Sequence, residues 1–206
     1  MAVATTGSLA RTPSQHARRA RIISTATELL DERDYERIQI REVAEGAGVA
    51  LATLYRYFPS KEQLYAHVLV AWSEGFGTGV PPGRSASATD EARVRAALRR
   101  AVRAYERHPN FYRLITVLET VSDPVVAELY AGWAGRYGDA LRSALHDVDP
   151  EDADAIVMLL SSLLGSLLRS WSMGKAPISR VYAELDRAVD LVFRAPLPRV
   201  SEVSTA

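Results

Sequence analysis

Apolar side chains recur along this chain at the three- and four-residue spacing that marks one face of a helix. From Ser14 to Arg33, for example, Ile22, Ala26 and Leu30 fall on one face, and polar residues fill the opposite face. No segment alternates with the two-residue period that a half-buried strand would show. The pattern therefore predicts an all-α fold, in which amphipathic helices share an apolar core.

The stretch from Arg41 to Lys61, REVAEGAGVALATLYRYFPSK, predicts two short helices joined by a tight turn. Gly46 and Gly48 mark the turn, because glycine is the usual residue where the backbone becomes left-handed. In the second helix Leu54 and Phe58 are four residues apart and should face the core. A helix-turn-helix of this kind places its second helix in the major groove of DNA. From spacing alone, a small helical hairpin with a solvated aromatic face is an equally good interpretation.

A break in the helical pattern divides the chain into two parts. The segment 75–88, GFGTGVPPGRSASA, is rich in Gly, Pro, Ser and Ala and predicts a linker. Its spaced glycines resemble a nucleotide-binding loop only superficially, because no strand precedes them and two prolines follow. The expected organisation is a disordered arm over 1–13, a helix-turn-helix domain with its linking fourth helix over 14–74, the linker over 75–88, a second helical domain over 89–195 and a tail over 196–206.

Cap residues predict the helices of the second part. The expected starts are Thr89, Asn110, Asp123-Pro124, Asp149-Pro150 and Ser179, and the expected ends are Arg107, Val121, His146, Met173 and Arg194. The first of these helices has an arginine-rich face, which is most simply a solvated surface. The last two are apolar over more than one face, which predicts a symmetric four-helix interface between two copies of the chain. The alternative is a fully covered core within one copy.

Composition excludes several kinds of chemistry. The 206 residues include 25 basic and 25 acidic side chains and no cysteine, so disulfides, thiol catalysis and thiolate metal sites are excluded. The four histidines are scattered, and no HExxH, GxSxG or phosphate loop occurs, so we expect no catalytic site, metal or cofactor. The N-terminus lacks the apolar core of a signal peptide, and the longest apolar run, Ala155 to Leu168, is too short to span a membrane. We therefore expect a cytoplasmic protein without a membrane partner.

Within the helix-turn-helix stretch, the segment TLYRYFPSKEQL resembles the DNA-binding signature of the TetR family of bacterial transcriptional regulators. The resemblance is close from Arg18 to Leu69, and it places DNA binding ahead of the plain helical hairpin. It implies a homodimer, joined through the last two helices, that binds a double-stranded, pseudo-palindromic DNA operator. We expect a repressor that an apolar small-molecule effector releases. The alternatives are a helical protein-interaction module and, less favoured, a small helical enzyme.

Family positions that contact DNA can be carried over to this chain one by one. Leu51, Ala52 and Thr53 match positions that approach base edges, and Lys61 matches a phosphate clamp. Arg56 is equally compatible with DNA and with solvent. The full set of expected DNA contacts is Arg18, Arg19, Arg41, Leu51, Ala52, Thr53, Tyr55, Arg56, Tyr57 and Lys61.

Two positions depart from the family pattern. Gln39 and Ala50 stand where a capping Thr or Ser is usual before the two helices of the motif. Because neither side chain is a preferred helix cap, we expect weaker caps and doubt the backbone contacts that the family makes at these two positions.

Aromatic residues recur at helical spacing in the second part of the chain. Ordinary core packing is the default explanation of such a set. In a regulator of this family, however, the bundle surrounds an effector cavity, and aromatic walls suit a flat or extended apolar ligand. The pairing of VA-x-x-TLYRYFPSK with SSLLGSLLRSW and LDRAVDLV further resembles the family members that repress sterol-degradation genes in mycolic-acid bacteria, which implies a lipid or steroid-like effector. The expected effector contacts are Tyr105, Phe111, Tyr112, Tyr130, Trp133, Tyr137, Leu164, Leu168 and Trp171.

Overall fold

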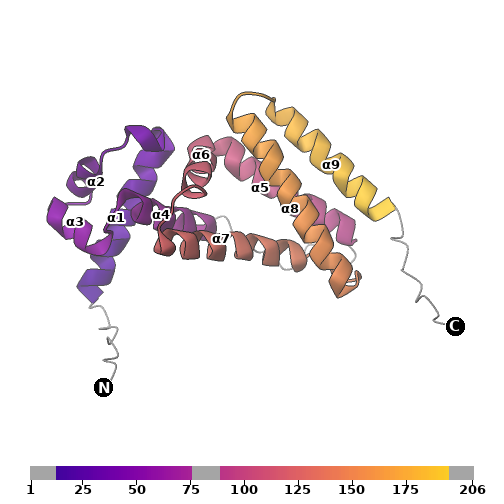
Figure 1. The fold of residues 1–206 in the computed structure, drawn as a ribbon, viewed down its shortest axis with the longest axis horizontal. Helices are drawn as coiled ribbons and strands as arrows, with labels where there is room; N and C mark the ends of the chain where they lie inside the picture. Colours follow the sequence, from indigo (N-terminus) through magenta and orange to yellow (C-terminus); the bar gives the residue numbers. More distant parts are fainter. Residues whose placement is uncertain (1–12, 76–88, 195–206) are drawn as a thin grey trace, which may run out of the picture.

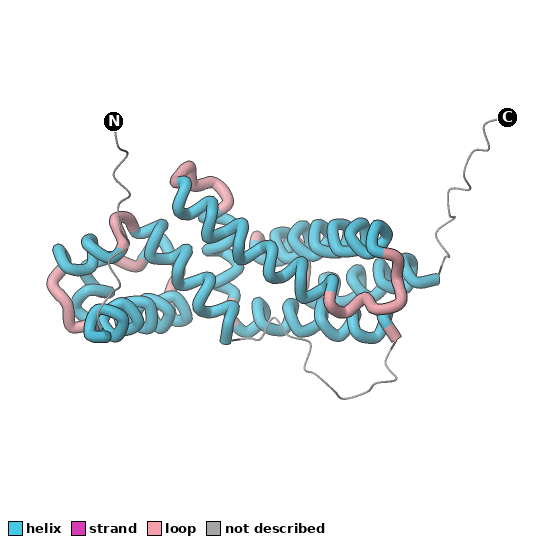
Figure 2. Tube along the Cα trace, turned by 90° about the horizontal axis from the view of Figure 1, so that it is seen from below, coloured by secondary structure: helices cyan, strands magenta, loops and turns pink. Residues whose placement is uncertain are grey.

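The computed structural model describes residues 13–75 and 89–194, and every regular element within these ranges is a helix (Figures 1 and 2). The all-α prediction is therefore confirmed. The predicted arm, linker and tail lie outside the described residues, apart from their border residues. The elements are α1 (Pro13–Glu32), the 3₁₀ turn η1 (Tyr35–Arg37), α2 (Ile40–Gly46), α3 (Leu51–Tyr57), α4 (Lys61–Gly75), α5 (Asp90–Arg107), α6 (Pro109–Leu118), α7 (Pro124–Arg142), α8 (Pro150–Ser172) and α9 (Ile178–Arg194).

The first four helices form one end of an elongated molecule, and the remaining helices form the other end (Figure 1). The two ends meet where α4 lies along α7 and where α1 contacts α6. At the far side, α8 and α9 form an antiparallel pair that packs against α5 and α7. One continuous apolar core runs through both ends, from Ile22 of α1 to Val189 of α9.

Of the predicted helix starts, Thr89 and Asp123 are confirmed as caps, whereas Asn110 and Ser179 lie inside α6 and α9, which begin one residue earlier, and Ser60 caps α4. The Ser60 hydroxyl accepts a hydrogen bond from the Gln63 amide at 3.1 Å, and the Asp123 carboxylate accepts from the Val125 amide at 2.8 Å. Thr89 caps α5 in the same way. The cap predicted at Asp149 is wrong, because its side chain makes no hydrogen bond to the first turn of α8.

The two unusual cap positions of the helix-turn-helix behave differently. Ala50 provides no side-chain bond to α3, as expected. At the start of α2, however, the Glu42 carboxylate accepts from the Gln39 amide at 2.9 Å, and this bond lowers the pKa of Glu42. The start of α2 is therefore better satisfied than the residue at position 39 alone suggested, because half of a capping box is supplied by Glu42.

The arginine-rich face of α5 is only in part the solvated surface that the sequence predicted, because Arg103 is exposed but other arginines pair with α9. Arg95 donates to the carboxylates of Asp190 at 2.6 Å and Asp186 at 3.1 Å, and Arg99 also pairs with Asp186. Both acidic residues belong to α9. These arginines therefore hold α5 against α9, at one edge of the bundle.

The helix-turn-helix depends on two glycines for different reasons. Gly48 has φ +64°, so it supplies the left-handed residue that turns the chain between α2 and α3. Gly46 is the last residue of α2, and a Cβ at this position would be only 2.7 Å from Cγ2 of Thr25 in α1. The absence of a side chain at Gly46 is thus what lets α2 pack closely on α1.

We expect Gly46→Ala to lower the free energy of unfolding by about 1–3 kcal/mol, because the new methyl group overpacks the contact between α1 and α2. Urea unfolding monitored by circular dichroism measures the loss. The matched variant Gly46→Ala/Thr25→Ser removes the clashing Cγ2 and should regain most of the stability. Equal stability of the single and double variants would contradict this account.

Candidate nucleic-acid interface and ligand cavity

The second helix of the motif, α3, is fixed to the core by two side chains. Leu54 is fully buried and Phe58 is almost fully buried, which confirms their predicted core role. The rest of the helix surface points outward as a consequence: Ala52 and Arg56 are exposed, and Tyr55 retains 45% of its accessible surface. A short helix presented in this way is free to enter a DNA groove.

The remaining predicted contact residues on α3 divide into two groups. Leu51 is 40% exposed at the first turn, beside Ala52. Thr53 and Tyr57 are only half-buried, and the Tyr57 ring lies 6.5 Å from that of Phe58. The exposed surface of α3 is therefore largely apolar at its N-terminal turn, where contact with thymine methyl groups is the available chemistry, and more polar toward its end.

Three arginines of the predicted set lie on α1 and α2 rather than on α3. The Arg19 guanidinium lies 5.2 Å from the centre of the Phe58 ring, so α1 brings a positive charge to the C-terminal end of α3. Arg18 precedes it and is half-buried. Arg41 of α2 keeps 70% of its side-chain surface exposed, and its nearest carboxylate, that of Glu45, is 4.0 Å away. These positions surround α3 with side chains that can bind phosphates.

Lys61 is held more tightly than a simple phosphate clamp would be. Its ammonium donates to the Tyr35 carbonyl at 2.6 Å and lies 4.0 Å from the centre of the Tyr35 ring. Burial lowers the pKa of Lys61, although Glu36 and Glu62 oppose this effect. An ammonium carries three donors, so hydrogen atoms remain for a phosphate after the bond to Tyr35 is made.

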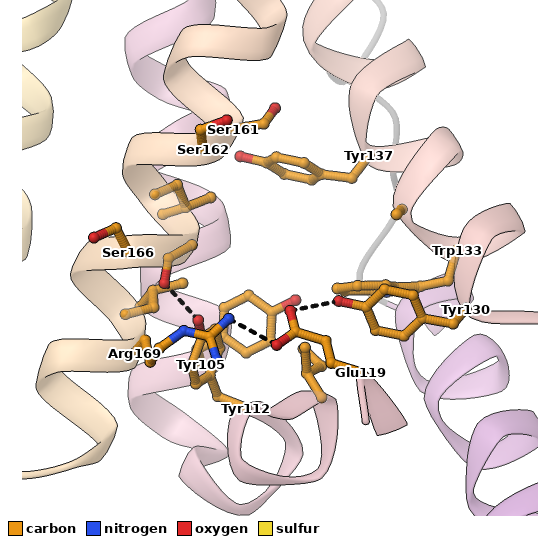
Figure 3. A pocket seen from close by; sticks show the side chains of 15 residues that line it. Tyr105, Tyr112, Glu119, Tyr130, Trp133, Tyr137, Ser161, Ser162, Ser166 and Arg169 are labelled. Carbon is orange, nitrogen blue, oxygen red and sulfur yellow. Dashed lines mark hydrogen bonds and ion pairs between the residues drawn. The ribbon is translucent and has the colours of Figure 1, made fainter. Parts of the chain in front are cut away.

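A cavity of about 450 Å³ lies between α5, α6, α7 and α8 (Figure 3). This volume is within the range of small-molecule sites. The cavity is lined by Tyr105, Tyr112, Ile115, Glu119, Tyr130, Trp133, Ala134, Tyr137, Ser161, Ser162, Leu164, Gly165, Ser166, Leu168 and Arg169.

Two residues of the predicted effector set do not line this cavity. Phe111 is fully buried and stacks on Trp72 of α4, with ring centres 4.3 Å apart. Trp171 packs against the core near the end of α8. Helical spacing could not separate them from the lining residues, because the same face of a helix passes both the cavity and the solid core.

One end of the cavity holds a polar network that joins three helices. The Glu119 carboxylate, just after α6, pairs with Arg169 of α8 at 2.7 Å and accepts from the Tyr130 hydroxyl of α7 at 2.8 Å. The hydrogen bond from Arg169 to Glu119 raises the pKa of the arginine, so the guanidinium stays charged. The Tyr112 hydroxyl donates to the Gly165 carbonyl at 2.6 Å. Gly165 is thus part of the cavity wall.

The carboxylates of Glu119 and Asp123 do not act as a pair. Asp123 caps α7 and accepts from the Gln63 side chain of α4 at 2.9 Å, and these bonds lower its pKa. Glu119 belongs to the cavity network. The two acidic residues therefore have separate partners and separate structural roles.

Helix α6 connects the cavity to the helix-turn-helix end. Its inner face contributes Tyr112 and Ile115 to the cavity wall. At its start, the Asn110 side chain donates to the Leu30 carbonyl of α1 at 2.9 Å, and Arg113 pairs with Asp34. A displacement of α6 by a bound molecule would therefore act directly on α1.

The longest apolar segment, which the sequence pattern predicted to be too short to span a membrane, is longer than expected. The run from Ala155 to Leu168 is part of α8, which has 23 residues and passes the length and composition test for a membrane-crossing helix within the described ranges. Only 28% of its apolar window is buried in one copy of the chain. Met158 and Leu159 are exposed on it, and Leu191 is exposed on α9. The outer face of the α8–α9 pair is thus an uncovered apolar surface.

Comparison with known proteins places both halves of the chain. Residues 22–68 match the model of "Bacterial regulatory proteins, tetR family", and residues 88–192 match that of "Tetracyclin repressor-like, C-terminal domain". The chain is 32% identical to the HTH-type transcriptional repressor KstR of Rhodococcus jostii (strain RHA1), covering 87% of this chain and 84% of that protein. It is 31% identical to KstR of Mycolicibacterium smegmatis, covering 87% and 88%.

A solved structure gives the same result for the fold. A TetR transcriptional regulator from Rhodococcus sp. RHA1 superimposes with a TM-score of 0.72 at 29% identity, covering 91% of this chain and all of the other. The similarity therefore extends over both the helix-turn-helix end and the bundle.

Proposed function

Because the chain belongs to the TetR family of bacterial regulatory proteins, we propose that it is a homodimeric repressor that an apolar small molecule releases from its operator. The observation that carries the proposal is the exposed surface of α3, presented outward by buried Leu54 and Phe58. The KstR relatives are named as repressors, which supports the sign of regulation proposed here. Their names also favour a transcriptional regulator over the alternative of a small helical enzyme.

The proposed DNA contacts follow from the exposure of each side chain. Ala52 and Thr53 approach base edges, and Arg41 reaches a base or a phosphate. Tyr55 and Lys61 bind phosphates, so they contribute affinity without sequence preference. The further proposed contacts of this DNA interface are Arg18, Arg19, Leu51, Arg56 and Tyr57.

The proposed dimer uses the uncovered outer face of α8 and α9. Two copies packed through this face form a four-helix bundle and bury Met158, Leu159 and Leu191. A two-fold axis then sets the two α3 helices against successive major grooves, about 34 Å apart, and implies a pseudo-palindromic operator. This arrangement also accounts for the apolar length of α8 without a membrane.

We expect Leu159→Asp to dissociate the dimer, because it places a charge at the centre of the proposed four-helix contact. Sedimentation analysis should show monomers at protein concentrations where the unmodified chain is dimeric, and operator affinity should fall at least about tenfold, since each monomer offers one α3. Val125→Asp introduces the same charge at another exposed apolar position and should remain dimeric. A dimeric Leu159→Asp variant would refute this interface.

The proposed effector site is the cavity between α5 and α8, with Tyr105, Tyr112, Tyr130, Trp133, Tyr137, Leu164 and Leu168 from the predicted set. The resemblance to repressors of sterol-degradation genes, together with the KstR relatives, supports a lipid or steroid-like effector. The domain division at 75–88 is likewise a proposal, and the two family matches, which end at 68 and begin at 88, support it.

The proposed signal runs through α6 and α4. An effector shifts the equilibrium only by its difference in affinity between two conformations of the bundle. A ligand that displaces Glu119 or Tyr112 moves α6. The contacts of Asn110 and Arg113 then carry this movement to the end of α1. The bond between Gln63 and Asp123 links α4 to α7 in parallel. The two α3 helices then take a spacing that the operator does not match.

Genomic footprinting of the purified protein, followed by gel shifts on the bound sites, tests the proposed function. Operator affinity should fall at least about tenfold between 50 and 200 mM salt, because phosphate contacts release counterions. A scrambled site should bind far more weakly at each salt concentration. Binding that ignores both salt and sequence would favour the protein-interaction module instead.

A further inference from the structure

The two ends of the cavity differ in how their polar groups are satisfied. At one end Glu119, Arg169 and Tyr130 bind one another, so no charge there lacks a partner. At the other end, the hydroxyls of Tyr137 and Ser161 are both buried, and neither has a hydrogen-bond partner among the described residues. A buried hydroxyl without a partner is unfavourable and rare in a native fold. Its presence in a cavity wall points to a group that is supplied from outside.

The two unsatisfied hydroxyls come from helices on opposite sides of the cavity. Figure 3 shows the Tyr137 side chain, on α7, directed across the cavity with its hydroxyl toward the serines of α8. Ser161 lies on the α8 segment that this hydroxyl faces. An oxygen atom of a bound molecule placed between them would meet two hydroxyl groups from opposite walls.

The chemistry of this end selects a neutral oxygen. Burial raises the pKa of the Tyr137 phenol, and the nearby positive charge of Arg100 only partly opposes this, so the hydroxyl keeps its proton at neutral pH. Tyrosine and serine hydroxyls both donate and accept, which suits a keto or a hydroxyl oxygen. The charged residues that line the cavity are Glu119 and Arg169, which neutralise each other at the far end. Arg100 is near Tyr137 but does not line the cavity, so a carboxylate beside Tyr137 would meet no cation in the wall itself.

The walls between the two ends are apolar and aromatic. Tyr105 and Trp133 contribute ring surfaces, and Leu164 and Leu168 contribute aliphatic surface. Such walls bind a hydrocarbon body and leave the polar ends to fix its orientation. The two ends of the cavity are therefore different, so a ligand binds in one orientation. Its hydrocarbon part lies in the apolar middle, and its polar end meets the hydroxyls that lack partners within the chain.

We propose that Tyr137 and Ser161 form an oxygen-binding subsite, and that the effector is an uncharged apolar molecule carrying a keto or hydroxyl oxygen at one end. The proposal rests on the assignment of this cavity as the effector site. An oxygen atom of the ligand would provide the hydrogen-bond partner that both hydroxyls lack. An isosteric hydrocarbon cannot do so, and this difference is the specificity that the subsite provides.

The experiment compares matched probes that differ only in the oxygen. Androstan-17-one, androstan-17-ol and androstane share a steroid body, and 2-tridecanone and tridecane share a linear one. Equilibrium dialysis with mass-spectrometric quantification gives the Kd of each probe for the full-length protein. For at least one of the two carbon skeletons, the probe with an oxygen should bind at least about tenfold more tightly than the matched hydrocarbon. The ketone and alcohol arms distinguish which oxygen the subsite prefers.

Two variants test whether Tyr137 and Ser161 cause the preference for oxygenated probes. Tyr137→Phe and Ser161→Ala should each reduce it, and the double variant should bind oxygenated and hydrocarbon probes with Kd values within about threefold of each other. Tyr137→Phe should also melt at the same temperature as the unmodified protein or higher, because its hydroxyl has no partner to lose. Tyr182→Phe is the matched control: it removes a hydroxyl that bonds Glu106 outside the cavity, and it should keep the preference.

Three outcomes would overturn the subsite: no preference for oxygenated probes in the unmodified protein, an unchanged preference in the double variant, or no binding of any probe. Operator binding, measured by gel shift in the same samples, reports separately on the proposed function. Preference for the oxygenated probe without release of operator DNA would support the subsite and contradict the effector role of the cavity.

Discussion

Replacing Ala52 by glutamate is expected to lower the affinity for operator DNA at least about a hundredfold, or ~2.7 kcal/mol. Ala52 is exposed in the first turn of α3, where the account places base edges and phosphates. A carboxylate there is repelled by the phosphate backbone and leaves the counterions in place. Gel shifts with the footprinted operator measure the loss.

The Ala52→Glu substitution should weaken DNA binding without weakening the fold. An acidic residue in the first turn of a helix interacts favourably with the helix dipole, so the variant should be at least as stable as the unmodified protein. Ala131→Glu adds the same charge at an exposed position of α7 and should bind operator normally. Unimpaired operator binding by Ala52→Glu would show that α3 does not enter the groove.

Replacing Asp90 by alanine is expected to cost about 3–5 kcal/mol of unfolding free energy, the range for breaking a buried ion pair from one side. Asp90 is only 6% exposed. Its carboxylate pairs with Arg93 and accepts from the backbone amides of His146 and Asp147, both at 2.9 Å. The variant removes the carboxylate beside Arg93, which keeps its bond to the Ala144 carbonyl, and it leaves two amide donors without their acceptor, at the point where the start of α5 fixes the loop between α7 and α8.

Urea unfolding at constant pH measures this loss. Asp90→Asn is the matched variant, since an amide oxygen can still accept from the two backbone amides while only the pairing with Arg93 is weakened. It should therefore lose clearly less stability than Asp90→Ala. A loss below about 1 kcal/mol for Asp90→Ala would mean that the loop between α7 and α8 is held by other contacts.

Local signals were enough to predict most of the fold. Ser60, Thr89 and Asp123 act on amides two or three residues away, so their caps are visible in the sequence itself. The core positions Leu54 and Phe58 follow from helical spacing in the same way.

Contacts between distant segments could not be predicted. Besides neighbours in α5, Arg95 binds Asp186 and Asp190 of α9, and Asp90 binds the amides of His146 and Asp147 in a loop. These partners lie more than 50 residues along the chain, so the sequence alone showed an arginine-rich face and an ordinary N-terminal aspartate. For the same reason Lys61 was predicted only as a phosphate contact, although it also binds the Tyr35 carbonyl.

The cavity was predicted in part. Its aromatic members share a helical spacing, which made them candidates. Glu119, Ser161 and Arg169 were missed, because their role depends on how three helices meet. The only sequence signal was that serines and an arginine interrupt an otherwise apolar helix.

The central claim is that α3 enters the major groove at two points related by a two-fold axis. The chain has no cysteine, so Ala52→Cys provides a single attachment site for an iron chelate that cleaves nearby DNA. The account predicts two cleavage clusters on the footprinted operator, about one helical turn apart, and none from the same chelate on Ala131→Cys. Operator that is bound by the Ala52→Cys conjugate but left uncut, or cut equally by both conjugates, would contradict it.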